Sequence, residues 1–527
     1  MKLRAPDAAP ATARLPINWF PGIFLAAFLT IISASATAEA QTSAGGLNPA
    51  EKWVIAQVSA GEIADLSKRF PADNDRKLSG HFLGELLAGA LSGVKPHRNG
   101  VRIIWAIIDE PIDLRNSQIS HEVWLGYCKF NSSATFSRAS FAGVVSFDGS
   151  RFKEEATFNG MKVGGVASFS DAVFEGPVNF VGADIASEFH ADGAHFQNKE
   201  KIATFGGMKV RGYAFFSKAV FEGPVHFIAA DIAGNFEAQG AQFQNKQQTA
   251  NFNGMKVGAD ASFKNAVFEG PADFSSADIA GEFGAQEAKF QNKEKTASFS
   301  GMKVRGYALF STAVFEGPTD FSYADFAWLD LSSPFWPKVA GQFHMQGMSY
   351  KYIRAIPGNE PESHKMLLKL TDQSAYTADV YSNLEEFFSR QGYRADADRA
   401  FIAGKRRERK ENLHGLGWLG SYLLDWLVGY GRRPWQAGIP CAVLVALGCI
   451  LFSPKKMERQ RREDAPRVYS RFWYSLGLFL PFVDLQADKV WKPKADETFL
   501  RNYMRVHILL GWILIPIVLA ALTGLIK

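Results

Sequence analysis

The residues of this chain that could do chemistry are few and scattered. Gly415, Gly417 and Gly420 fit the Gly-x-Gly-x-x-Gly pattern, which binds dinucleotides when it joins a strand to a helix. Here the pattern follows a basic helix and enters an apolar, Trp-rich segment, which favours a flexible or interfacial turn. His190 and His195 lie close in sequence but lack the further ligands that a metal site needs. We therefore expect no catalytic residue, no metal site and no cofactor.

The three cysteines of the chain also indicate packing and not chemistry. Cys128, Cys441 and Cys449 have neither the spacing of metal ligands nor that of a disulfide framework. Cys128 stands two positions before Phe130, where small inward residues occur elsewhere in the chain. Cys441 and Cys449 both lie in an apolar segment near the C-terminus. We expect all three to be packed thiols.

A phenylalanine or aliphatic residue recurs in steps of five and six between Val101 and about Leu331. Two positions before most of these stands a small residue, as in Ala134-x-Phe136. Neither the 3.6-residue period of a helix nor the strict alternation of a half-buried strand fits this spacing. It suits a chain that turns a corner every few residues and points one large and one small side chain inward. Such turns stack into a solenoid.

A longer period of 47 residues is superimposed on these steps. Phe-Glu-Gly-Pro begins at residues 174, 221, 268 and 315, and Gly-Met-Lys-Val ends at 163, 210, 257 and 304. Eight inward steps fill each period, which predicts two turns of a square coil. An aspartate recurs with the same period at 184, 231 and 278. Stacked carboxylates could bind a cation, but we interpret these as turn residues.

One step in each period is longer and contains a polar insertion, at residues 197–201, 244–248 and 291–295. These insertions should project from one edge of the coil at every second turn, about 10 Å apart. Their lysines are the candidate binding residues of the chain: Lys199, Lys201, Lys246, Lys293 and Lys295. The alternative is a tolerated surface insertion copied by duplication.

The small-x-Leu/Phe-x-x units resemble those of the pentapeptide-repeat family. The resemblance implies a mainly-β fold, a right-handed quadrilateral β-helix of roughly ten turns over residues 101–331. Certain bacterial membrane-bound members of that family also resemble the C-terminal part. They carry a helix like Tyr381–Gly392, a Gly-Tyr-Gly-x-x-Pro-Trp stretch as at 429–435, and Leu-Pro-x-Val-Asp-Leu, as at 480–485, between two membrane helices.

The N-terminal hundred residues predict an export signal and a cap. Residues 1–40 combine positive charge, a short apolar core and small residues before Ala40, as in a cleaved signal peptide; an uncleaved anchor is the alternative. Residues 41–100 contain apolar-rich helical patterns. Because a solenoid must cover its terminal apolar face, we expect a helical N-terminal cap there.

The C-terminal part predicts a helical linker at 332–434 and a membrane module at 435–527. Two apolar segments are predicted to be transmembrane helices: residues 508–526 are long enough to span a bilayer, whereas residues 437–452, about 24 Å as a helix, are of marginal length. Residues 472–485 suggest an interfacial or re-entrant helix. Basic residues between the spans place the loop 454–506 in the cytoplasm by the positive-inside rule. The β-helix is then predicted to be periplasmic, at a bacterial inner membrane.

The charge of the predicted solenoid argues against a nucleic-acid partner. Residues 101–331 contain 27 acidic and 20 basic side chains, an excess too small to imitate DNA, so no nucleic-acid partner is expected. The predicted function is non-enzymatic: a membrane-anchored scaffold whose partners are membrane lipid and an unknown protein. The oligomeric state is not predicted. Two alternatives remain, a membrane-associated redox protein, from the label of some relatives, and a two-helix pore, from the order of the C-terminal segments.

Overall fold

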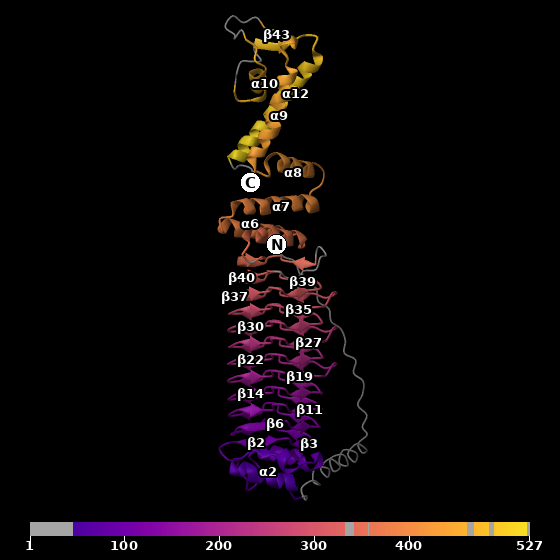
Figure 1. Ribbon diagram of the computed structural model, residues 1–527, viewed down its shortest axis with the longest axis vertical. Helices are drawn as coiled ribbons and strands as arrows, with labels where there is room; N and C mark the ends of the chain where they lie inside the picture. The colour runs from indigo at the N-terminus through magenta and orange to yellow at the C-terminus, as the bar shows by residue number, and fades with distance from the viewer. Residues whose placement is uncertain (1–45, 333–341, 357, 461–467, 484–489, 524–527) are drawn as a thin grey trace, which may run out of the picture.

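The chain forms a long rod with helices at both ends (Figure 1). The computed structural model describes residues 46–332, 342–356, 358–460, 468–483 and 490–523. The signal peptide predicted at 1–40 lies outside these residues. Helices come first, a stack of short strands follows, and a second helical part completes the rod. The mainly-β solenoid with helices on both sides is confirmed.

The N-terminal helices cover the first turn of the stack. They are α2 (Pro49–Ala60), the short α3 (Leu66–Arg69) and α4 (Gly80–Ala88), with the 3-10 helix η1 (Asp73–Arg76) between α3 and α4. α2 begins in a capping box, in which Asn48 and Glu51 each accept a hydrogen bond from the backbone of the other. Val58 and Leu83 are fully buried in the same core as Ile103 of the first turn. The helices thus act as the predicted cap.

Each turn of the solenoid contains four short strands, one on each of four faces. One such turn comprises β10 (Val145–Ser146), β11 (Arg151–Phe152), β12 (Ala156–Thr157) and β13 (Lys162–Val163), and we number the faces 1 to 4 in this order. Every strand pairs in parallel with its equivalent one turn on, so that Phe152 lies opposite Phe174. Within the described residues face 3 has eleven strands, so the solenoid has about eleven turns.

The strands of faces 2 and 4 carry the surfaces discussed below. Face 2 contains β3 (Ile107–Ile108), β7 (Lys129–Phe130), β11, β15 (Val173–Phe174), β19 (His195–Phe196), β23 (Val220–Phe221), β27 (Gln242–Phe243), β31 (Val267–Phe268), β35 (Lys289–Phe290) and β38 (Val314–Phe315). Face 4 contains β5 (Gln118–Ile119), β9 (Ser140–Phe141), β13, β17 (Asp184–Ile185), β21 (Lys209–Val210), β25 (Asp231–Ile232), β29 (Lys256–Val257), β33 (Asp278–Ile279) and the first residues of β37 (Lys303–Leu309).

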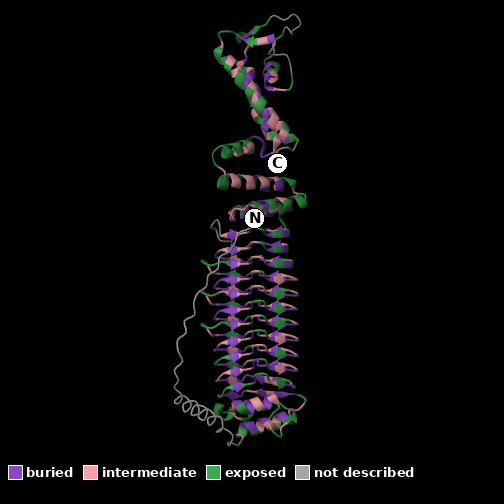
Figure 2. Ribbon diagram, turned by 180° about the vertical axis from the view of Figure 1, so that it is seen from behind, coloured by how far each residue is buried: buried purple, intermediate pink, exposed green. Residues whose placement is uncertain are grey.

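Phenylalanine rings fill the interior in continuous columns. Figure 2 shows the buried residues of the strands as bands along the solenoid. On faces 2 and 3 each ring stacks nearly parallel on the ring of the next turn; the centroids of Phe227 and Phe205 are 4.7 Å apart. Rings of the opposite faces 1 and 3 meet edge to face, as Phe227 and Phe216 do at 5.0 Å. Both geometries are favourable for aromatic pairs. The columns therefore supply the core of the rod.

Large and small side chains exchange places on face 1 from turn to turn. Ala214 and Phe216 point inward in one turn, and Phe236 and Ala238 occupy the same two positions in the next. Face 4 alternates too, with Met208 and Val210 followed by Ala230 and Ile232. This alternation explains why the sequence repeats after two turns and why some inward steps are four or seven residues long.

The solenoid extends beyond the predicted boundary at Leu331. The strand β40 (Asp325–Asp330) pairs in parallel with β42 (Ser349–Arg354), and β41 (Phe343–His344) continues face 3. Met345 and Tyr350 are buried in this last turn in the places that Phe321 and Phe326 hold one turn earlier, and Met348 is buried opposite Ala324. The prediction was wrong here because residues of other types replace the phenylalanines that marked the earlier turns.

Four helices follow the solenoid: α5 (Glu360–Gln373), α6 (Ala378–Arg390), α7 (Arg394–Asn412) and α8 (Gly415–Val428). α6 covers the last turn, where the ring of Phe387 packs on Tyr350 and the Asn383 side chain donates to the carbonyl oxygen of Met348 at 2.8 Å. The glycine pattern at 415–420, interpreted above as a turn, opens α8. That prediction was wrong in its secondary structure.

The C-terminal module contains two helices that are long and apolar enough to cross a membrane, among the residues that the structure describes. The first is α9 (Gly438–Leu451) with the preceding 3-10 turn η2 (Pro434–Ala437), and the second is α12 (Thr498–Leu522). α12 begins ten residues before the predicted span at 508–526. The helix α10 (Arg471–Phe479) packs against both. The 3-10 turn η3 (Pro454–Lys456) leads to a small antiparallel pair, β43 (Met457–Arg459) and β44 (Trp491–Pro493).

We expect Phe227→Ala to lower the free energy of unfolding by about 3–5 kcal/mol, because it leaves a cavity between two stacked rings. Chemical denaturation followed by circular dichroism measures the loss. Lys246→Ala on the surface of a neighbouring turn is the control and should change stability by less than about 0.5 kcal/mol. Equal effects of the two changes would contradict a core held by the ring columns.

Candidate interaction surfaces

The polar insertions form closed loops that are held by an asparagine. In each loop the side-chain oxygen of the asparagine accepts hydrogen bonds from the backbone N–H groups two and three residues on, at 2.7–3.1 Å. These asparagines are Asn198, Asn245 and Asn292. An asparagine that bonds its own backbone in this way makes a defined turn. The loops have one shape, repeated at every second turn.

Three of the five predicted binding lysines pair with a glutamate of the next turn. The distances between nitrogen and oxygen are 3.3 Å for Lys199–Glu222, 3.5 Å for Lys246–Glu269 and 3.6 Å for Lys293–Glu316. The lysine side chains remain about three-quarters exposed. Exposed ion pairs of this kind stabilise a fold by only about 0–1 kcal/mol. The lysines therefore stay available to a partner at little cost to stability.

The other two predicted lysines differ from each other. The Lys295 ammonium donates to the carbonyl oxygen of Gln247 at 2.7 Å, and the Asn292 amide donates to the carbonyl oxygen of Lys246 at 3.2 Å. These two loops, 47 residues apart, thus touch each other. Lys201 is exposed, and its backbone N–H is bound by the loop asparagine. Gln248 takes the equivalent place in the middle loop.

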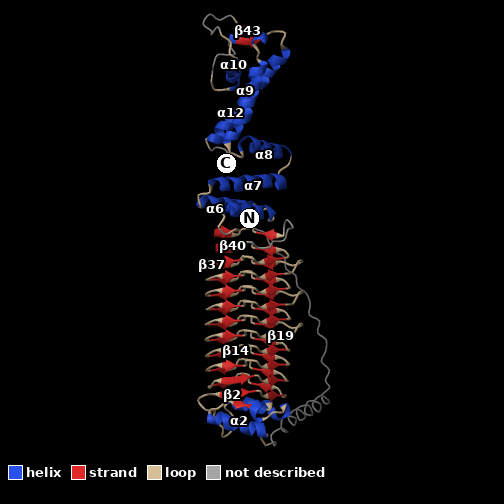
Figure 3. Cartoon of the chain, in the orientation of Figure 1, coloured by secondary structure: helices blue, strands red, loops and turns tan. Residues whose placement is uncertain are grey.

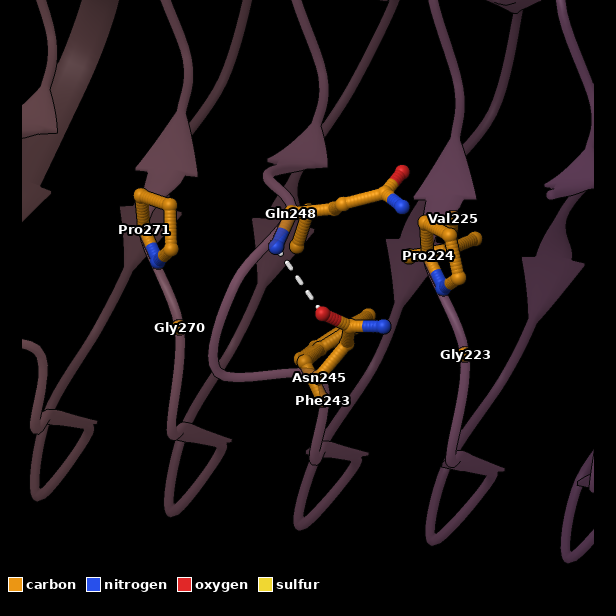
Figure 4. Close-up of a pocket in the computed structure, with 9 residues that line it drawn as sticks. Gly223, Pro224, Val225, Phe243, Asn245, Gln248, Gly270 and Pro271 are labelled. Atoms are coloured by element: carbon orange, nitrogen blue, oxygen red, sulfur yellow. Dashed lines mark hydrogen bonds between the residues drawn. The ribbon is translucent and has the colours of Figure 1, made fainter. Parts of the chain in front are cut away.

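The glycine of each Phe-Glu-Gly-Pro unit leaves space for the backbone of the adjacent loop. A Cβ at Gly223 would lie 1.9 Å from the carbonyl oxygen of Asn198, and one at Gly270 would lie 2.0 Å from that of Asn245. Figure 4 shows the loop of Asn245 and Gln248 between the two Gly-Pro pairs. The cavity left there measures about 10 Å³, room for one water molecule at most. The loop and the Gly-Pro pairs therefore pack closely against each other and leave no pocket for a ligand.

Face 4 carries a ladder of alternating charge, which we call the Lys–Asp ladder. In register on consecutive turns it contains Lys162, Asp184, Lys209, Asp231, Lys256, Asp278, Lys303 and Asp325. The aspartates of the 47-residue period therefore lie between lysines and not beside one another. Opposite charges across neighbouring strands contribute roughly 0.2–1 kcal/mol per pair. This arrangement favours a structural role over cation binding.

The scattered chemical groups stay apart or buried. In the described part of the chain no three His, Cys, Asp or Glu side chains gather closely enough to hold a metal ion. His190 lies 3.0 Å from the Glu188 carboxylate on face 1, and His195 is exposed on face 2. Cys128 is fully buried, and burial raises the pKa of its thiol to about 12. This thiol is a packing group, as predicted.

A charged contact joins α7 to α8, which leads to the two helices that are long and apolar enough to cross a membrane. Asp425 of α8 receives hydrogen bonds from Arg406 at 2.9 Å and Arg409 at 3.1 Å, both on α7. Burial alone would raise the pKa of Asp425, but these two guanidinium groups outweigh it and lower the pKa. The carboxylate is therefore ionised at neutral pH, and it fixes one side of α8 against α7.

Sequence reasoning found the lysines but missed their partners. The glutamate follows the lysine at a constant distance of 23 residues, at Lys199–Glu222, Lys246–Glu269 and Lys293–Glu316. That spacing is a detectable signal once the length of the intervening turn is known. The apolar side of α8 was also missed, because its glycines had suggested a turn.

A comparison with models of protein families identifies the type of repeat in this chain. The family model described as pentapeptide repeats (9 copies) matches residues 114–162 and 158–198. The match confirms that the chain contains pentapeptide repeats. No curated protein and no solved structure matches the chain.

Gly223→Ala should lower the free energy of unfolding by about 1–3 kcal/mol, because its Cβ would strike a backbone oxygen that cannot move aside. Gly84→Ala is the matched control. Gly84 lies inside α4 with nothing within 4 Å of an added Cβ, so the change should stabilise the cap by about 0.5–1 kcal/mol. Denaturation midpoints compare the two, and an unchanged midpoint for Gly223→Ala would refute the proposed fit between loop and Gly-Pro.

Proposed function

We propose that this pentapeptide-repeat protein is a membrane-anchored scaffold for contact with another protein at the bacterial inner membrane. The observation that carries the proposal is a rigid solenoid joined by a continuous series of contacts to a module with exposed apolar helices. Pentapeptide-repeat β-solenoids are generally not enzymes, which agrees with this role. In the proposal the solenoid is periplasmic and the loop at 454–506 is cytoplasmic.

The apolar surface of the C-terminal module supports anchoring. Ile439, Val443 and Ile450 of α9 and Leu509 and Trp512 of α12 are each more than half exposed. Large apolar side chains in such number are costly in water, and they are normal where acyl chains surround a helix. Lipid is therefore the environment that best fits the surface of these two helices.

The contacts between rod and anchor support a fixed geometry. The Arg390 side chain on α6 donates to the carbonyl oxygen of Tyr350 in the last turn at 3.2 Å. Arg432, which follows α8, binds Glu385 of α6 and, at 3.2 Å, Asp398 of α7. Each helix of the linker is thus tied to its neighbour by charged or hydrogen-bonded groups. A scaffold that holds a partner at a set distance from the bilayer needs such a connection.

The lysine loops are the surface we assign to the protein partner. Lys199, Lys246 and Lys293 project at one edge, with one loop for every two turns. Their glutamates neutralise them only in part, because the pairs are solvated. A partner with acidic groups repeated at a similar interval would fit this edge, with each contact individually weak.

Labelling of single cysteines in intact cells tests the location. In a chain carrying Cys441→Ala and Cys449→Ala, we expect Lys246→Cys to react with a membrane-impermeant maleimide and Lys456→Cys to react only after lysis. Cys128 is buried and can stay. The reverse labelling would place the solenoid in the cytoplasm and would contradict the proposed topology.

A photo-crosslinking amino acid at Lys246 tests the partner surface, with Lys256 in the Lys–Asp ladder as the control on another face. We expect one adduct of constant mass at Lys246 that is absent at Lys256. The adduct should disappear when Lys199 and Lys293 are changed to alanine, because neighbouring loops then no longer contribute. Adducts of equal yield on both faces would argue against the loops as the contact surface.

A further inference from the structure

Helix α8 presents an apolar face that is largely exposed in the described structure, although the Arg409 guanidinium of α7 lies over its Tyr422 ring, 5.3 Å from the ring centroid. Its exposed side chains recur three and four residues apart, so they share one side of the helix. They are Leu416, Trp418, Leu419, Tyr422, Leu423 and Trp426, each 44–87% exposed. As a helix of 14 residues, α8 is about 21 Å long, too short to span a bilayer.

The other sides of α8 are occupied, which fixes the direction of this apolar face. Asp425, its one charged residue, is held by the arginines of α7, and Ser421 lies 2.8 Å from the Tyr430 hydroxyl. Leu427 and Val428 at the C-terminal end are buried in the same apolar cluster as residues of α9 and α12. The free face therefore continues the apolar surface of the two membrane helices.

The position of α8 in the rod agrees with this continuity. α8 runs across the end of α9 and α12 that is nearer the solenoid (Figures 1 and 3). A membrane that surrounds α9 and α12 would reach its boundary at that level. A helix lying there in the plane of the bilayer would place its apolar side among the acyl chains.

The composition of the face favours lipid over a second protein. Trp418, Tyr422 and Trp426 are residues that concentrate at the boundary between headgroups and acyl chains, and the exposed Trp435 follows them. Cations are close by, since Arg433 lines a groove with Lys410 and other basic residues of α7. Anionic lipid headgroups complement such a groove.

We propose that α8 is an interfacial helix that lies in the bilayer surface on the solenoid side and sets the angle of the rod to the membrane. The inference rests on the proposed membrane anchoring and adds a second element of contact with lipid. Because α8 is fixed to α7, and α7 through α6 to the last turn, the plane of the membrane also orients the solenoid.

The test uses the full chain with Cys441→Ala and Cys449→Ala, reconstituted in vesicles of neutral and anionic phospholipid. An environment-sensitive fluorophore is attached to Leu419→Cys in α8. Ile513→Cys, exposed on α12, is the deep control, and Lys246→Cys on the solenoid is the aqueous control. Lipids with a quencher near the headgroup or deep in the acyl chain report the depth of each probe.

We expect the Leu419 probe to shift its emission to the blue and to be quenched more by the shallow lipid than by the deep one. The Ile513 probe should show the opposite order, and the Lys246 probe should respond to neither. A Leu419 probe that behaves like the Lys246 probe would overturn the inference while anchoring stands. Disulfide-linked dimers through Leu419→Cys would overturn it in favour of a second copy. An unquenched Ile513 probe would instead refute membrane anchoring itself.

Discussion

The structure depends on one constraint, the stacking of closed turns at a fixed rise. Each turn bonds to the next through backbone hydrogen bonds on all four faces, so the strands of neighbouring turns keep one register and one separation. Every layer must then be filled by nearly the same volume of side chain, because interiors are close-packed. The exchange of Phe and Ala on face 1 and the alternation of Met-x-Val with Ala-x-Ile on face 4 both meet this condition. Two complementary layers form the unit that the sequence repeats.

The same constraint shapes the outside of the solenoid. An insertion in one turn has to be accommodated by the next, since the strands above and below keep their register. Gly223 leaves space for the carbonyl oxygen of Asn198, and Glu222 faces Lys199. On face 4 the register would place like charges together if both turns carried lysine, and the alternation avoids that repulsion. Surface regularity in this protein is thus a consequence of stacking, and a partner can use it only as a repeated pattern.

The constraint also explains which features the sequence could predict. Inward positions such as Phe205 and Phe227 depend on a local rule, one large residue per face, so their spacing predicted the solenoid and its two-turn period. The last turn was not predicted, because Met345 and Tyr350 stand in it where Phe321 and Phe326 stand one turn earlier. The glutamate partners of the lysines were not predicted, because the pairing depends on the number of residues in a whole turn. α8 was not predicted to be a helix, because tertiary contacts stabilise it despite its glycines: Asp425 binds arginines of α7, and Leu427 and Val428 are buried against α9 and α12.

The connection between rod and membrane module depends on arginine. Arg432 binds carboxylates on α6 and α7 and stacks its guanidinium over the Phe401 ring at 4.4 Å. Arginine suits this position because its planar fork bonds two acceptors while its face covers an aromatic ring. Arg406 and Arg409 both donate to the Asp425 carboxylate, and the Arg409 guanidinium lies 5.3 Å from the centroid of the Tyr422 ring. These contacts lie between the solenoid and α9, so the placement of the rod relative to α9 and α12 depends on them. A displacement of α9 and α12 would reach the solenoid through α8, η2 and this set of arginines.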